Sequence, residues 1–99
     1  MAKFVQIIEF QTTKFDEMMK VIDEYRGKTE GKRTVRHVLN GKVRDRDNTY
    51  MTIVEFDSYE DARKNNDLPE TAEMAQKMQA LGDGPPTFYD IDVSLEQND

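Results

Sequence analysis

The chain has 99 residues, of which 36% are hydrophobic and 34% charged, and its formal net charge at pH 7 is −6. This length corresponds to one domain, and so short a chain hides only roughly 60–65% of its unfolded surface on folding. With so little core material, we expect the domain to complete its burial by pairing with a second copy of itself. The absence of cysteine excludes a disulfide framework and a thiolate metal site, and a single histidine excludes a multi-histidine centre within one subunit.

The sequence carries no targeting or membrane signal that we can recognise. The first ten residues, MAKFVQIIEF, lack the apolar region and cleavage site of a signal peptide. No apolar run approaches the ~20 residues needed to span a bilayer. We therefore expect a cytoplasmic protein without a membrane partner.

Positive charge is concentrated in residues 26–46, which hold eight basic and two acidic residues and leave a net charge of −12 for the rest of the chain. Such a segment could attract an anion, or it could be a solvated edge strand protected from aggregation by its Lys and Arg side chains. We favour the second interpretation. Nucleic acid is not an expected partner, because the segment has no aromatic residue to stack on bases and the pI of the whole chain is 4.8.

The first β-strand is predicted at residues 3–11, KFVQIIEFQ, which are rich in β-branched and aromatic side chains. A helix should follow, with Thr13 and Asp16 forming a start that resembles a capping box and with Gly27 ending it. One apolar stripe at helical spacing supports this helix: Phe15, Met18, Met19, Ile22 and Tyr25.

A second and a third strand are predicted at residues 33–39 and 50–56. The Asn-Gly dipeptide at 40–41 is a strong signal for a tight turn, and DRDN at 45–48 is another. We therefore interpret residues 40–48 as the connection of a hairpin, either as a plain loop or with a short ribbon of its own.

The next segment predicts a helix in two pieces. Ser58 with Asp61 repeats the capping-box pattern and starts a short helix that runs to about residue 64. Asp67 with Glu70 should cap a second piece, which has a proline in its first turn and ends at Gly82.

A last strand is predicted at residues 87–93, with its apolar side chains alternating on one face. The element order is then β-α-β-β-α-β, and the similar runs QIIEF at 6–10 and TIVEF at 52–56 open its two halves. Right-handed crossovers turn this order into a ferredoxin-like α+β sandwich with a four-stranded antiparallel sheet. We expect one domain over residues 1–95, a frayed tail over 96–99, and the first and third strands side by side at the centre of the sheet.

The two central strands are apolar on both faces. In the first strand, Phe4, Ile8 and Phe10 alternate with Val5 and Ile7, and the third strand has the same pattern. Two helices cover only one face of a sheet, so the other face needs a second cover. We expect that cover to be the sheet of a second subunit, which gives a dimeric α+β barrel.

Three segments of the chain, TIVEFDSYEDA, NDLPETAEMAQKM and DGPPTFYDIDV, resemble the dimeric α+β barrel superfamily, and within it the antibiotic biosynthesis monooxygenase-like domains. The resemblance covers nearly the whole chain, and its motifs are structural. It implies a ligand between the sheet and the helices of one subunit. Some members oxidise hydroquinone- or anthrone-like aromatics with dioxygen and no cofactor, whereas others isomerise lactones, cleave haem or have no known activity. Haem cleavage is disfavoured, because this chain has no tryptophan and no histidine on a predicted helix.

Glu9 and Glu55 are the next-to-last residues of the two similar runs, called here the twin runs, and they suggest a paired-carboxylate site. Antiparallel strands would place them on one face but toward opposite ends, roughly 7–13 Å apart. We therefore expect each carboxylate to pair separately with an arginine, a lysine or a hydroxyl group. His37 falls on the same alternation as Val35 and Leu39, where it is either a packing residue or the one side chain suited to act as a base near neutrality.

The sequence thus predicts a homodimer that binds an aromatic or polyketide-like small molecule and needs no cofactor. The expected ligand-binding residues are Arg36, Tyr50, Met74, Met78 and Tyr89, with methionine supplying an adaptable apolar lining. If the protein is an enzyme, we expect a cofactor-independent monooxygenase or isomerase in which His37 or Glu55 withdraws a proton. Arg36 or Tyr50 would then stabilise the resulting oxygen anion. A non-catalytic binder or sensor, and a purely structural dimer module, are the alternatives.

Overall fold

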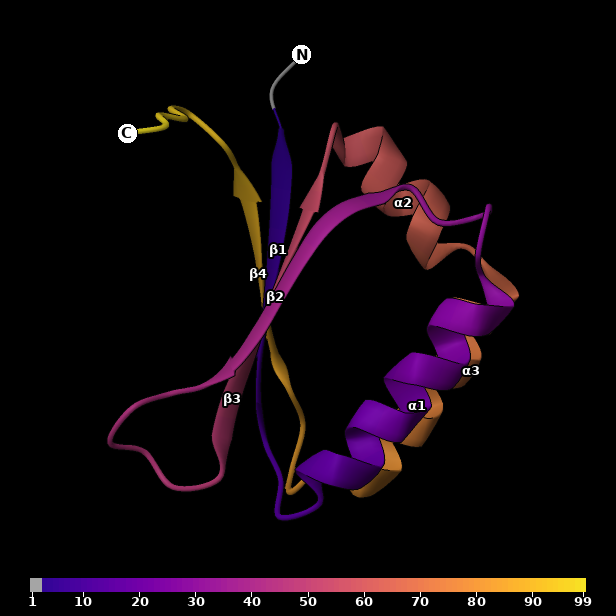
Figure 1. Ribbon diagram of the computed structural model, residues 1–99, viewed down its shortest axis with the longest axis vertical. Helices are drawn as coiled ribbons and strands as arrows, with labels where there is room; N and C mark the ends of the chain where they lie inside the picture. The colour runs from indigo at the N-terminus through magenta and orange to yellow at the C-terminus, as the bar shows by residue number, and fades with distance from the viewer. Residues whose placement is uncertain (1–2) are drawn as a thin grey trace.

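The computed structural model describes residues 3–99 and has the order β-α-β-β-α-α-β. Its elements are β1 (Phe4–Gln11), α1 (Phe15–Lys28), β2 (Val35–Lys42), β3 (Thr49–Phe56), α2 (Tyr59–Asn66), α3 (Pro69–Leu81) and β4 (Thr87–Asp92). The sheet order is β2-β3-β1-β4, and all neighbouring strands are antiparallel. The three helices lie on one side of the sheet, and the other side is uncovered (Figure 1). The predicted ferredoxin-like sandwich is confirmed.

The strands β1 and β3, which contain the twin runs, pair with each other at the centre of the sheet, as predicted. Phe4 lies opposite Phe56, and Ile7 lies opposite Ile53. Phe4 and Phe56 are buried together with Ala62 of α2, so their face of the sheet is the helix side. Because side chains alternate along a strand, Ile7 and Ile53 point to the opposite face, called here the outer face.

The start of α1 differs from the prediction. Thr13 and Asp16 do not form a capping box; Lys14 precedes the helix and makes no side-chain cap. The buried hydroxyl of Thr12 instead accepts a hydrogen bond from the Lys14 N–H at 2.9 Å and donates to the Leu81 carbonyl at 2.7 Å. This threonine therefore ties the beginning of α1 to the end of α3, a tertiary contact that local sequence cannot reveal.

The end of α1 also differs, because Gly27 lies inside the helix, which continues to Lys28. Both the N–H and the hydroxyl of Thr29 donate to the Tyr25 carbonyl, at 3.0 and 2.6 Å, and these bonds close the last turn. The left-handed conformation expected of a glycine past a helix end is found later, at Gly31, with φ of 83°.

The Asn-Gly dipeptide at 40–41 is not a turn. Both residues lie within β2, where they pair with Thr52 and Met51 of β3. The connection is made further along, where Asp45 and Asn48 adopt left-handed conformations with φ of 69° and 55°. Extending the ladder supplies main-chain hydrogen bonds that an early turn would forgo, so long-range pairing prevails over the local turn signal.

A β-bulge near the start of β2 changes which face its residues occupy. Val35 pairs with Phe56 on the helix side, whereas His37 already pairs with Glu55 on the outer face. The extra residue is Arg36, whose guanidinium binds the carboxylate of Asp57 at 2.6–2.7 Å. The prediction that Val35 and His37 share one face is therefore wrong, because a bulge inserts one residue into the alternation.

The two-piece second helix is confirmed, and one of its two predicted caps is found. The Ser58 hydroxyl accepts a hydrogen bond from the Asp61 N–H at 3.1 Å, which starts α2. Asp67 does not cap α3; Leu68 precedes the helix without a side-chain cap, and a proline opens the first turn. Gly82 ends α3 as predicted.

The molecule exposes more surface than its mass requires. The accessible area is 7059 Å², against about 5,800 Å² for a compact monomer of this mass by the usual scaling law. Part of the excess is the chain after β4, which extends from the sheet (Figure 1). Within residues 3–99, no helix is both long and apolar enough to cross a bilayer.

Candidate functional site

Three aromatic rings form a stack between the sheet and the first turn of α1. Phe10 of β1 and Tyr50 of β3 are cross-strand neighbours, with ring centroids 5.7 Å apart and an interplanar angle of 19°. Phe15 of α1 stacks on Tyr50 at 4.2 Å and 9°. The stack forms one end of the layer between sheet and helices, called here the helix-side layer, and it presents flat aromatic surface there.

The helix-side layer is incompletely closed at both edges of the sheet. Val38 of β2 pairs with Val54, and Phe88 of β4 pairs with Ile8, so both side chains belong to the helix side. Yet Val38 is 49% exposed and Phe88 is 57% exposed. Apolar side chains that face the covered side of a sheet are usually buried, so these two mark places where the helices do not seal the layer.

Three polar side chains meet where α1, α2 and α3 converge. Tyr25 and Asn65 are 8% and 6% exposed. The Tyr25 hydroxyl lies 2.8 Å from the Thr71 hydroxyl, which donates to the Asn65 carbonyl at 2.7 Å. The Asn65 side-chain N–H donates to the Tyr25 oxygen at 3.3 Å. Among residues 3–99, the side-chain oxygen of Asn65 is the one buried side-chain polar atom without a hydrogen-bond partner.

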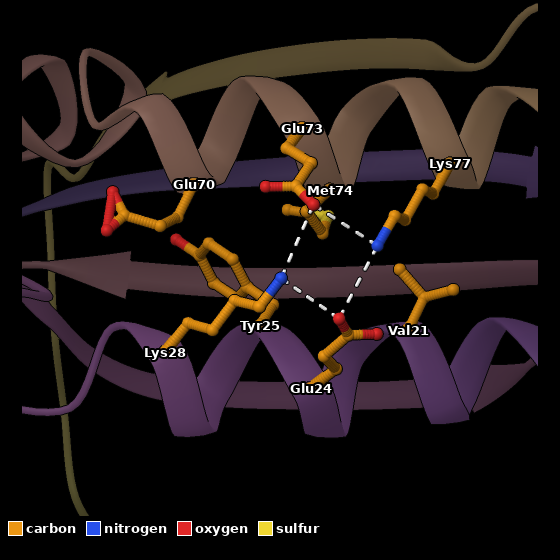
Figure 2. Close-up of a pocket in the computed structure, with 8 residues that line it drawn as sticks. All are labelled: Val21, Glu24, Tyr25, Lys28, Glu70, Glu73, Met74 and Lys77. Atoms are coloured by element: carbon orange, nitrogen blue, oxygen red, sulfur yellow. Dashed lines mark hydrogen bonds and ion pairs between the residues drawn. The ribbon is translucent and has the colours of Figure 1, made fainter.

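The seam between α1 and α3 is closed by four charged side chains. Lys28 lies 2.9 Å from Glu24 and 3.3 Å from Glu73, and Lys77 lies 3.5 Å and 3.2 Å from the same two carboxylates. Figure 2 shows these contacts as a closed quadrilateral across the seam, with Met74 beside its Glu73 corner. The space enclosed beside them is about 10 Å³, which is roughly the room that one water molecule needs. The seam is therefore not an entrance for a ligand.

The same ion pairs shift the titration of their members. Hydrogen bonding to Lys28 lowers the pKa of Glu24, and hydrogen bonds to Lys77 and Lys28 lower the pKa of Glu73. Hydrogen bonds to the two carboxylates raise the pKa of Lys28. These groups are exposed to water, which screens their interactions, so we regard the quadrilateral as a modest clamp on the helix pair.

The outer face carries a hollow of about 580 Å³ beside β4. It is lined by Ile7, Met51, Phe88, Tyr89, Asp90 and Ile91. Of these, Tyr89 and Ile91 are 45% and 39% exposed, and Leu39 on the other edge strand of this face is 55% exposed. A sheet face with large, exposed apolar side chains at both edges is typical of a surface that another protein covers.

Glu9 and Glu55 pair with separate side chains on the outer face, as predicted. The partner of Glu9 is an arginine, whereas the partner of Glu55 is His37, which was not among the expected partners. Glu55 Oε2 lies 2.9 Å from His37 Nδ1, and Glu9 Oε2 lies 3.4 Å from Arg46. Glu9 pairs in register with Met51, four residues from Glu55 along β3, which separates the two carboxylates by roughly 13 Å of strand. They therefore cannot share a proton.

The structure does not bring the predicted site residues into one pocket. His37, Glu55 and Tyr89 lie on the outer face, and Tyr50 lies on the helix side. Met74 and Met78 belong to α3, where Met74 lines the seam with α1. Arg36 occupies the bulge and is engaged by a carboxylate. The sheet separates the proposed base from Tyr50, so within one subunit Tyr50 cannot stabilise an anion that His37 or Glu55 creates.

Two features were not singled out by the sequence. Phe10 and Phe15 were assigned to a strand and a helix stripe, but their stacking on Tyr50 depends on the sheet register. Asn65 falls just beyond the predicted end of the short helix, at about residue 64, but lies inside α2. A polar residue three positions after Ala62, on the buried side of α2, is the signal that could have identified it, because such a position usually demands a hydrogen-bond partner.

Comparison with solved structures shows the same fold in several proteins of low sequence identity. SnoaB from Streptomyces nogalater, a cofactor-independent oxygenase solved as a mutant form, superposes with a TM-score of 0.83 at 14% identity over 100% of both chains. A candidate antibiotic biosynthesis monooxygenase from Caulobacter crescentus CB15 gives 0.81 at 11% identity, over 95% of this chain and 92% of that one. Rv0793 from Mycobacterium tuberculosis superposes with a TM-score of 0.79 at 11% identity, over 98% of this chain and 100% of that one.

Comparisons based on sequence found no matching protein-family model and no similar curated protein. The structural match to antibiotic biosynthesis monooxygenase proteins nevertheless extends over the full length of the chain. The chain therefore has the α+β fold of the dimeric barrel proteins that its sequence resembles. At identities of 6–15% this likeness establishes the fold alone.

Proposed function

We propose that this protein is a homodimeric barrel in which each subunit binds an aromatic or polyketide-like small molecule between the sheet and helices α1 and α3. The observation that carries the proposal is the incomplete closure of the helix-side layer. Val38 and Phe88 face that layer and remain about half exposed. The aromatic stack of Phe10, Tyr50 and Phe15 supplies flat apolar surface at one end, which suits a planar ligand.

The outer face supports the homodimer. Ile7, Ile53 and Tyr89 lie in one cross-strand row on this face, and the molecule has about a fifth more surface than a compact monomer of its mass. Packing the outer faces of two copies would bury this row, fill the hollow and supply the missing second cover of the sheet.

A ligand panel tests the proposed binding. Quinones, flavins and aromatic polyketides should be titrated into the protein under air, with binding followed by calorimetry and dioxygen consumption followed with an electrode. We expect at least one planar aromatic compound to bind, with an affinity that falls as its apolar area is reduced. Binding without oxygen uptake supports a binder or sensor, and no binding across the panel would favour the purely structural dimer.

Phe88 and Tyr89 provide a matched pair of variants that locates the ligand. They are neighbours on β4, both aromatic and both about half exposed, but they point to opposite faces of the sheet. If the ligand lies in the helix-side layer, Phe88→Ala should weaken binding several-fold and Tyr89→Ala should leave it within about twofold. Because Phe88 also borders the hollow on the outer face, loss of binding in Tyr89→Ala, with or without a loss in Phe88→Ala, would move the ligand to that face and contradict the proposed location.

The second candidate function is a cofactor-independent monooxygenase or isomerase. It is favoured by the contact of 2.9 Å between His37 and Glu55, because a carboxylate that holds Nδ1 of an imidazole leaves Nε2 as the atom able to accept a proton. Both residues belong to the outer face, so the substrate of such an enzyme would lie on that face over β2 and β3, between the two subunits.

Single variants distinguish the second candidate from the first. If any panel compound is turned over, His37→Ala should reduce kcat by about 10²-fold or more, as expected for loss of a general base. Glu55→Gln should cause a smaller loss, because it removes the orienting partner and leaves the imidazole. Turnover that is unchanged in His37→Ala would remove this pair from the mechanism without affecting the binding proposal.

A further inference from the structure

The polar side chains at the junction of the three helices form a closed ring of hydrogen bonds. The Asn65 side-chain N–H donates to the Tyr25 oxygen at 3.3 Å. The two hydroxyls of Tyr25 and Thr71 lie 2.8 Å apart, and the Thr71 hydroxyl donates to the Asn65 backbone carbonyl at 2.7 Å. Because the Thr71 proton is used there, the Tyr25 proton must lie toward Thr71.

This ring fixes the orientation of the Asn65 amide. The ring has three contacts, and the described orientation supplies three protons: one from the amide, one from tyrosine and one from threonine. If the amide were turned by 180°, its oxygen would face Tyr25 and only the two hydroxyl protons would remain for three contacts. One pair of oxygen atoms would then meet without a proton between them, so the amide oxygen must be the atom that points out of the ring.

The outward-pointing oxygen, Oδ1 of Asn65, has no donor. The residue is 94% buried, since its exposure is 6%, and within residues 3–99 no other buried side-chain polar atom lacks a partner. Buried polar atoms in native proteins are almost always hydrogen-bonded to protein, water or ligand. Asn65 and Ala62 are the buried residues of α2, and Ala62 packs on Phe4 and Phe56. Asn65 therefore lies on the side of α2 that Ala62 packs against the sheet.

We propose that Asn65 Oδ1 is the hydrogen-bond acceptor for a neutral hydroxyl or N–H group of the ligand, an inference that rests on the proposed binding in the helix-side layer. The ligand class is an apolar, planar body that carries a donor such as a phenol, an enol or an alcohol. An ether of the same shape offers no proton to Oδ1. A phenolate also lacks the proton and would have to be buried as a charge, which is unfavourable without a paired cation.

Three probes of nearly constant shape test the assignment: 1-naphthol, 1-methoxynaphthalene and naphthalene. Their affinities for the intact protein should be measured near neutral pH by calorimetry, with ligand-observed NMR for the weakest. One hydrogen bond of typical net strength in the binding free energy predicts that 1-naphthol binds roughly three- to tenfold more tightly than 1-methoxynaphthalene or naphthalene. In Asn65→Leu, which is close in size, the three affinities should become equal within about twofold while naphthalene still binds.

A second variant keeps the test independent of whether Asn65→Leu folds. Tyr25→Phe retains Oδ1 but removes the hydroxyl that orients the amide, so the preference for 1-naphthol should decrease without a comparable loss of naphthalene affinity. A wild-type protein that binds all three probes equally would overturn the inference and assign Oδ1 to an ordered water, with the binding proposal intact. Failure of every probe to bind would instead contradict the proposed function, and with it the role of Oδ1.

Discussion

The rings of Phe15 and Tyr50 are stacked with centroids 4.2 Å apart and planes 9° from parallel. Phe15 is the first residue of α1, and Tyr50 lies near the start of β3. This contact therefore fixes where the helix begins relative to the central strands. It links two segments 35 positions apart in the sequence, and the same rings form one end of the helix-side layer.

Loss of this stack should destabilise the fold. Phe15→Ala should lower the free energy of unfolding by about 2 kcal/mol, which is less than the ~3–5 kcal/mol lost when a fully buried phenylalanine is truncated, because Phe15 is only half-buried. Urea denaturation followed by circular dichroism measures the change. Phe88→Ala, at a more exposed aromatic position, is the control and should cost under about 1 kcal/mol. Equal losses at the two positions would show that the stack has no special role.

Self-association should depend on the outer face. Ile7→Lys places a charge at the centre of that face, next to Ile53 and Tyr89, and burying it against a second copy should weaken dimerisation by at least about 2 kcal/mol, or roughly 30-fold in Kd. Analytical ultracentrifugation would report the change.

Val38→Lys is the matched control, because Val38 is exposed and apolar but belongs to the helix side. It should leave the association constant nearly unchanged. A wild-type protein that sediments as a monomer at working concentrations would contradict the homodimer itself.

The ion-pair quadrilateral should make stability depend on pH in the acid range. The pKa values of Glu24 and Glu73 are lowered in the folded state by their lysine partners, from an ordinary value of 4.5. A carboxylate whose pKa is lowered in the folded state stabilises the fold when the pH is above the ordinary pKa. This contribution is lost as the pH falls through the folded-state pKa. Thermal unfolding should therefore show a fall in Tm below about pH 4.5. In the Glu24→Gln/Glu73→Gln double variant, this part of the fall should be absent.

Salt provides an independent check on the quadrilateral. Because its side chains are exposed, molar sodium chloride should reduce the Tm difference between the wild type and the double variant at neutral pH. A difference that persists unchanged in high salt would indicate that glutamine alters packing in the seam.

The ring at the helix junction should show energetic coupling between its members. Tyr25→Phe removes one proton and leaves the Asn65 amide N–H without its acceptor, so it should cost about 1–2 kcal/mol of unfolding free energy. Thr71→Val should cost a similar amount. The double variant should lose less unfolding free energy than the sum of the two single losses, by at least about 0.5 kcal/mol, because both substitutions break the same ring. Strict additivity in urea denaturation would show that the two hydroxyls act separately.

The arrangement of the sheet could be predicted from the sequence because it depends on alternation. The two central strands carry apolar residues on both faces, and the strands that contain the similar runs QIIEF and TIVEF pair with each other in the structure. The cap at Ser58 and the helix end at Gly82 could also be predicted, because each depends on contacts within a few residues.

Predictions failed where a distant contact competes with a local signal. Asn40 and Gly41 have the composition of a turn but pair with β3. Thr12, which the sequence does not distinguish from Thr13, is the threonine that bonds to the end of α3. The prediction of the candidate site failed most widely, because residues were assigned to one site by their chemical type alone. Whether two such residues can act on one ligand depends on which sheet face each occupies.

The bulge at Arg36 shifts the alternation of side chains in β2 by one residue. Val35 packs on the hydrophobic core before the bulge, and after it His37 and Leu39 occupy the outer face while Val38 occupies the helix side. Aligning this strand with an uninterrupted edge strand of a distant homologue requires a one-residue gap at position 36; without it, every residue downstream would be compared with a side chain from the wrong side of the sheet.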